Sequence, residues 1–110
     1  MDLPPLADRR PKPRKRVLFS GVVVYDQGIY SCTCKIRNLT TDGARISTPA
    51  GQVLPSEVYL INLHSQVGYK ANVVWRRGVE AGLAFLSSFD PQTLADPEVA
   101  YLKRIWSAYK

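Results

Sequence analysis

Six positive charges are concentrated in eight residues, RRPKPRKR, at positions 9–16. Over residues 1–16, six Lys or Arg stand against two Asp, a net charge of +4, whereas residues 17–110 carry +2. Such a local concentration of charge predicts binding of a small or narrowly placed anion, although nucleic acid and acidic lipid surfaces also attract it. The arginines within it follow the spacing R-R-x-x-x-R: Arg9, Arg10 and Arg14.

A second polar group is NLTTDG at residues 38–43, which has the pattern N-x-T-x-x-G. The amide of Asn38 offers both a hydrogen-bond donor and an acceptor. Gly43 permits a close backbone approach or a positive φ. Backbone N–H groups of such a turn can also face an anion. The segment therefore predicts a polar turn at residues 40–43, a pattern that is generic on its own.

The basic segment itself is not predicted to be helical. Its prolines, Pro11 and Pro13, and the preceding Pro4 and Pro5 favour extended or polyproline conformations. We therefore predict a flexible basic arm over residues 1–16, followed by a single folded domain over residues 17–110.

The folded part has the pattern of a mainly β protein. Apolar and β-branched segments separated by turns predict strands at residues 17–25, 30–39, 44–48, 58–63, 69–75 and 81–86. The segment 17–25 is apolar throughout, which predicts burial on both faces. Six short strands without βαβ alternation predict a six-stranded antiparallel barrel. Cys32 and Cys34 fall on one face of a strand and are expected to be buried, reduced thiols.

The end of the chain changes to a helical period. Asp96 can cap a helix and Pro97 suits its first position. An apolar stripe follows at helical spacing, which predicts a C-terminal α-helix packed on the barrel: Val99, Leu102, Trp106 and Tyr109. A partner-binding role for Trp106 is the alternative.

Several functional classes have no support in the sequence. Motifs for phosphate loops, nucleophile elbows and paired-His metal sites are missing, and His64 lies in a turn without an acid or nucleophile motif nearby. We expect neither an enzyme nor a cofactor or metal. The lack of a long apolar run or an export signal predicts no membrane span and a cytoplasmic location.

The order of the two motifs resembles the signature of the PilZ domain family, in which R-x-x-x-R and [D/N]-x-[S/A]-x-x-G bind cyclic di-GMP. The resemblance covers about residues 9–86, and the chain looks like a short stand-alone alphaproteobacterial PilZ protein. Thr40 stands where the family has Ser or Ala, so its extra methyl group could crowd the pocket. Arg45 replaces a second small residue, and it could contact a phosphate or point outward.

The resemblance implies a cyclic di-GMP receptor with ligand contacts from seven residues: Arg9, Arg10, Arg14, Asn38, Thr40, Gly43 and Trp75. Trp75 would stack on guanine, whereas its alternation with Ala71 and Val73 favours a place in the core. Binding would order the arm and signal to a separate, unidentified protein, with motility or surface attachment as the output by family analogy.

Two other functions compete with this interpretation. A degenerate PilZ adaptor would act through protein contacts without nucleotide, using Trp106 and the closing helix. A small basic barrel could instead bind single-stranded nucleic acid, but this requires exposed aromatic residues along a basic groove. Here the charge lies on the arm, so nucleic acid is disfavoured.

Overall fold

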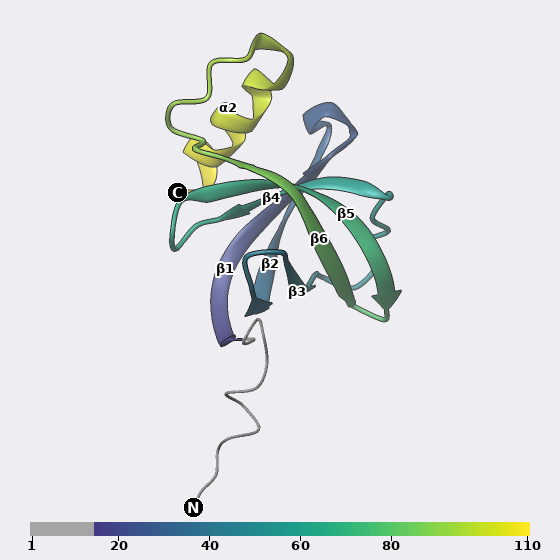
Figure 1. Cartoon of the computed structure of the whole chain (residues 1–110). Coiled ribbons are helices and arrows are strands. Elements are labelled where there is room, and N and C mark those ends of the chain that lie inside the picture. Colours follow the sequence, from purple (N-terminus) through teal and green to yellow (C-terminus); the bar gives the residue numbers. More distant parts are fainter. Residues whose placement is uncertain (1–14) are drawn as a thin grey trace, which may run out of the picture.

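A computed structural model describes residues 15–110, which form a closed antiparallel barrel of six strands with a C-terminal helix (Figure 1). The strand order around the barrel is β1-β2-β3-β6-β5-β4, and β4 pairs back onto β1. The mainly β fold predicted from the sequence is confirmed. The strands are β1 (Lys15–Tyr25), β2 (Tyr30–Leu39), β3 (Gly43–Ser47), β4 (Glu57–Asn62), β5 (Val67–Arg77) and β6 (Glu80–Phe89).

Strand β1 separates two hydrophobic clusters. Val23 and Tyr25 point into the barrel core, while Val22 and Val24 pack on the other side, beneath the C-terminal helix. Burial on both faces is therefore confirmed for this half of the strand. The prediction of burial on both faces is wrong for the first half of the strand. Leu18 there is 65% exposed, because the helix covers only the later part of β1.

Strand β2 follows the predicted alternation. Cys34 and Ile36 are buried, whereas Lys35 and Arg37, the residue after each of them, are exposed. Both cysteines are free. Burial raises the pKa of the Cys34 thiol to about 12, so this thiol stays protonated at neutral pH and acts as a small apolar core group.

The closing helix forms where the sequence predicts it. The Asp96 carboxylate accepts a hydrogen bond from Glu98 N (2.9 Å), which caps a short 3₁₀ helix, η2 (Pro97–Val99), that leads into α2 (Ala100–Tyr109). Leu102 and Trp106 are the buried residues of α2. Trp106 is 3% exposed, so the alternative in which it binds a partner does not fit the structure.

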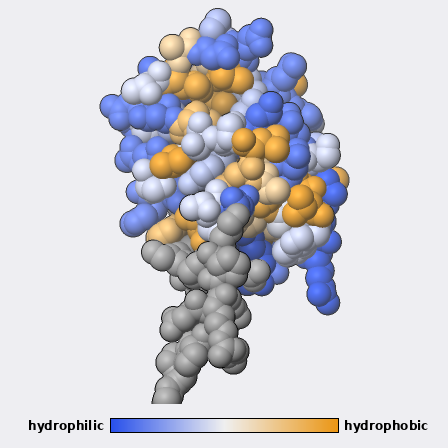
Figure 2. All heavy atoms as spheres, viewed as in Figure 1, coloured by the Kyte–Doolittle hydropathy of each residue, from blue (hydrophilic) through white to orange (hydrophobic). Residues whose placement is uncertain are grey.

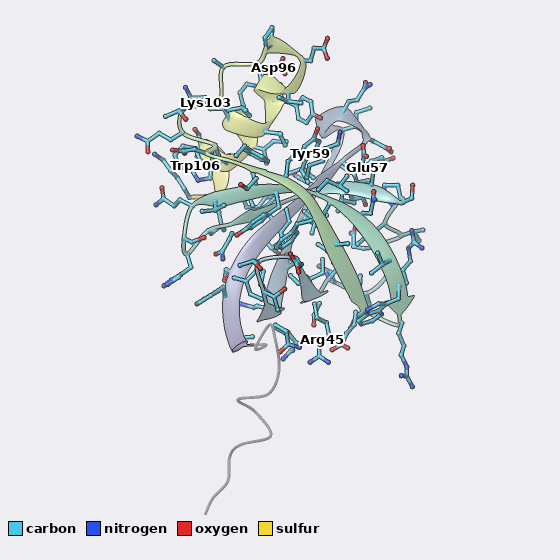
Figure 3. All side chains as sticks on the ribbon, in the orientation of Figure 1. Arg45, Glu57, Tyr59, Asp96, Lys103 and Trp106 are labelled. Atoms are coloured by element: carbon cyan, nitrogen blue, oxygen red, sulfur yellow. The ribbon has the colours of Figure 1, made fainter. Side chains whose placement is uncertain are left out.

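Helix α2 and the NLTTDG turn occupy different parts of the barrel. The β1–β2 hairpin tip, η1 (Asp26–Gly28), reaches α2, since any Cβ on Gly28 would meet the Tyr101 ring. At the other end of the same hairpin, Lys15 pairs with Leu39, just before the turn. Figure 3 shows Arg45 at this end and Trp106 on α2 at the opposite end. The end that carries the turn is therefore not covered by the helix.

The surface in Figure 2 mixes hydrophilic side chains with separate apolar patches. Among the exposed apolar residues are Val74 and Trp75 of β5, at 60% and 41% exposure. Within residues 15–110, no helix has the length and apolar character that crossing a bilayer requires.

The packing of α2 on β1 leads to a stability prediction. Leu102 is fully buried against Val22 and Val24, so Leu102→Ala should lower the free energy of unfolding by about 2–5 kcal/mol. Urea unfolding followed by circular dichroism measures the change. Lys103→Ala, at the adjacent exposed position, is the control and should stay within about 0.5 kcal/mol of the native protein. A Leu102→Ala protein as stable as this control would contradict the packing described.

Candidate ligand-binding groove

The candidate site is organised by one row of cross-strand partners on the barrel. Asn38 of β2 pairs with Arg45 of β3, Arg45 pairs with Gly82 of β6, and Gly82 pairs with Trp75 of β5. Directly paired residues present their side chains on the same face of a sheet. With strands about 4.8 Å apart, the row from Asn38 to Trp75 spans roughly 14 Å. Residues from four strands therefore form one continuous surface.

The row also continues to the strand that follows the basic segment. Asn38 pairs on its other side with Arg16 of β1. Arg9, Arg10 and Arg14 lie outside the described residues, but Arg14 directly precedes Lys15, the first residue of β1. The chain thus enters the barrel next to the NLTTDG turn.

Trp75 is on the outside of the barrel because of an irregularity in β5. The register shifts between Val73, which pairs with Leu83, and Trp75, which pairs with Gly82. The extra residue in this bulge, Val74, reverses the direction of the side chains that follow. The core position that the alternation predicted for Trp75 is therefore wrong. The side chain is 41% exposed and lines the groove.

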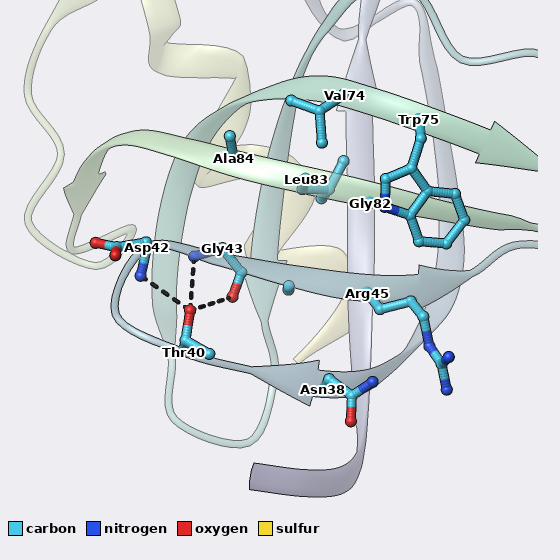
Figure 4. A pocket seen from close by; sticks show the side chains of 11 residues that line it. Asn38, Thr40, Asp42, Gly43, Arg45, Val74, Trp75, Gly82, Leu83 and Ala84 are labelled. Carbon is cyan, nitrogen blue, oxygen red and sulfur yellow. Dashed lines mark hydrogen bonds between the residues drawn. The ribbon is translucent and has the colours of Figure 1, made fainter. Parts of the chain in front are cut away.

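A glycine leaves the space that the Trp75 ring occupies. A Cβ at position 82 would overlap the indole at Nε1, Cδ1 and Cε2. Figure 4 shows the indole lying beside β6 at Gly82. The ring therefore packs against backbone on one side, which orients it without burying it.

The turn after β2 is held by the Thr40 side chain. Its Oγ1 accepts hydrogen bonds from Asp42 N and Gly43 N, both at 3.1 Å, and donates to Gly43 O at 3.3 Å (Figure 4). One donor and two acceptor positions are all that a hydroxyl has. The Thr40 hydroxyl is thus fully used within the turn, and the two N–H groups it binds do not face a ligand.

Gly43 is required by close packing rather than by its backbone angle. It pairs with Ala84, and a Cβ at position 43 would clash with the carbonyl oxygen of Leu83. Asp42 O also accepts a hydrogen bond from Phe85 N at 2.7 Å. The turn is therefore fixed against β6. Two roles were predicted for Gly43, a close backbone approach or a positive φ, and the structure shows the close approach.

Asn38 and Arg45 are joined through their side chains. The Asn38 amide donates from Nδ2 to Arg37 O (3.1 Å) and accepts at Oδ1 from Arg45 Nε (3.3 Å). The opposite orientation would place its oxygen against an acceptor and its nitrogen against a donor. Asn38 is 7% exposed and Arg45 half-buried, and both line the groove.

The groove these elements form has a volume of about 340 Å³, within the range of small-molecule sites. Four of the residues predicted from the sequence meet in it: Asn38, Thr40, Gly43 and Trp75. Sequence reasoning missed Gly82, Val74 and Ala84, and it left the direction of Arg45 open. These residues are far from the turn in the sequence or lie on other strands, and the pairing of the strands brings them to the groove. The described part of the chain contains no cluster of three or more potential metal ligands.

Comparison with protein families matches residues 8–99 of the chain to the PilZ domain. This range includes both predicted motifs, all six strands and the groove. A search of curated proteins found no match to the chain.

The turn predicts a specific effect of removing the Thr40 hydroxyl. Thr40→Val keeps the shape but leaves the N–H groups of Asp42 and Gly43 without their acceptor, so it should cost about 1–2 kcal/mol of unfolding free energy. Thr40→Ser retains the hydroxyl and should be nearly as stable as the native protein. Urea unfolding of both variants makes the comparison, and equal stabilities would contradict the role of the hydroxyl.

The position of the Trp75 ring predicts an effect of adding one methyl group. Gly82→Ala should displace the indole and shift its Nε1–H signal in ¹H–¹⁵N spectra, assigned with Trp75→Phe. The buried Trp106 indole supplies an internal control, since its signal should not move if the barrel stays folded. An unchanged Trp75 signal would show that the ring does not lie over Gly82.

Proposed function

The chain belongs to the PilZ domain family, whose members are cyclic di-GMP-binding or adaptor domains rather than enzymes, and on this premise we propose that it is a cyclic di-GMP receptor. The ligand would bind in the groove on the barrel. The basic segment would close over it from the side of β1.

The observation that carries the proposal is the row of paired residues. Asn38, Arg45, Gly82 and Trp75 share one face, and the row begins beside Arg16, two residues after Arg14. The NLTTDG motif therefore lies beside the start of β1, which the R-R-x-x-x-R motif precedes in the sequence. A dinucleotide on this surface would contact both of them.

Each residue type suits a part of the ligand. The Trp75 ring is rigid and exposed, and stacking of a base on such a ring contributes roughly 1–3 kcal/mol. The Asn38 amide can pair with the edge of a base. Arg10 and Arg14 would bind guanine O6 and N7 through their two-pronged donors, while Arg9 would meet phosphate or a second stacked ligand.

Thr40 and Gly43 enter the proposal in a changed role. Because the Thr40 hydroxyl is saturated within the turn, Thr40 would shape the floor of the groove instead of donating a hydrogen bond to the ligand. The extra methyl group relative to Ser belongs to a residue that lines the groove, so it would affect fit. Gly43 would keep the turn against β6.

The output would come from the arm. Ligand contacts made by Arg10 and Arg14 only in the bound state would shift the arm to an ordered conformation and create a new surface for a separate partner protein. Pro11 and Pro13 reduce the conformations that this step must remove. The cell would use this signal in motility or surface attachment, and the protein would act in the cytoplasm.

The competing functions have less support from the described residues. An adaptor working through Trp106 would need that side chain at the surface, whereas it is 3% exposed. Binding of single-stranded nucleic acid would need several stacking platforms along one groove. Trp75 is the one exposed aromatic side chain among the residues that line the groove in the described part of the chain.

Calorimetric titration with cyclic di-GMP tests the proposal. The native protein should bind, and Arg10→Ala and Arg14→Ala should each weaken binding by about ten- to a hundredfold, since each removes a two-pronged guanine contact. Arg104→Ala, an equal change of charge at an exposed position of α2, should bind as the native protein does. Absence of heat from the native protein at high micromolar ligand would overturn the proposal.

A further inference from the structure

The orientation of the Asn38 amide is fixed from two sides. Arg37 O faces its nitrogen and Arg45 Nε faces its oxygen. Rotating the amide by half a turn would break both hydrogen bonds and bring like groups together. An amide has two donor hydrogens and two acceptor positions, so after these bonds it retains one of each for a ligand. The donor and the acceptor left over therefore have fixed places in the groove.

The order of donor and acceptor distinguishes guanine from adenine. Guanine carries an acceptor, O6, next to a donor, N1–H. Adenine carries a donor, the N6 amino group, next to an acceptor, N1, at the same two ring positions. For a base that stacks on Trp75 in one orientation and turns its Watson–Crick edge to Asn38, an amide that could rotate would pair with either base, whereas an amide held in one orientation matches one base and opposes the other.

We propose that Arg45 sets the base selectivity of the groove by holding the Asn38 amide in the orientation that pairs with guanine. The inference rests on the proposed function, and it assigns to Arg45 a positioning role at that same site. Arg45 acts through Asn38 and need not touch the base itself.

The surroundings of Arg45 suit this role. It is the cross-strand partner of Asn38, so its position is fixed by the pairing of β2 with β3. Within the described residues it forms no ion pair that would draw the guanidinium away from Asn38. The carbonyl of Arg37 is part of the same strand as Asn38, so it remains whatever side chain position 37 carries.

Arg37 also provides a matched control. Its side chain is exposed and donates from Nε to Ser47 Oγ at 2.8 Å. Arg37→Met thus removes the same charge as Arg45→Met, from the same part of the barrel, and leaves both hydrogen bonds of the Asn38 amide in place.

The test compares the affinities for cyclic di-GMP and cyclic di-AMP. In the native protein and in Arg37→Met we expect the same ratio in favour of guanine. In Arg45→Met the ratio should fall roughly tenfold, because adenine gains a matching orientation of the amide. In an Asn38→Asp background, where the carboxylate has no orientation to choose, Arg45→Met should leave the ratio unchanged. A fall in both affinities by the same factor in Arg45→Met would overturn the inference and indicate a contact of Arg45 with the ligand.

A measurement without ligand separates this inference from the proposed function. In ¹H–¹⁵N spectra the Asn38 side-chain amide should give one hydrogen-bonded proton signal, which moves in Arg45→Met and stays in Arg37→Met. If the native protein does not bind cyclic di-GMP, the proposed function fails while this spectrum still reports on the amide. If the Asn38 signal is the same in all three proteins, Arg45 does not position the amide.

Discussion

The pairing register of the closed barrel is the constraint on which the site depends. Each strand of a barrel is held on both sides, so no strand can slip by one residue without turning its apolar side chains outward. The row that joins Asn38, Arg45, Gly82 and Trp75 is therefore fixed by the same pairing that buries Ile36, Ile46 and Leu83 in the core. Stability of the core and geometry of the groove are two results of one register.

The fold could be predicted almost completely from the sequence, because strand length, alternation and turn chemistry are local properties. The site could be predicted only in part. The NLTTDG turn is contiguous, so Asn38, Thr40 and Gly43 were found together. The direction of the Trp75 side chain is ambiguous in the sequence because a bulge breaks the alternation of β5. Nothing in the residues VVW indicates where the register shifts by one residue. Gly82 and Arg45 join the site through pairing across strands, and this pairing cannot be read from the local sequence.

The NLTTDG turn illustrates how residues of a motif can determine the shape of a groove without offering hydrogen bonds to a ligand. A hydroxyl at position 40 would be expected to face a ligand, yet all three of its hydrogen-bonding positions are used by the backbone of residues 42 and 43. The glycine is needed where the turn meets β6. Both residues thus build a rigid floor of the groove, and in the proposed function the contacts that recognise the ligand would come from other groups: the Asn38 amide, the Trp75 ring and the arginines of the basic segment.

This division of labour limits how the proposed receptor can signal. A closed barrel has no free edge, and α2 is bound to β1 through the fully buried Leu102, so the folded domain has little freedom to change shape when a ligand arrives. In the proposed receptor, a rigid groove would select the ligand by its fixed geometry, and for the same reason it would not change shape to signal that the ligand is bound. A change in the partner-binding surface of the proposed receptor would then come from the segment before β1, whose arginines would gain contacts only when the groove is filled. The barrel would determine which ligand binds, and the arm would change conformation to signal that it has bound.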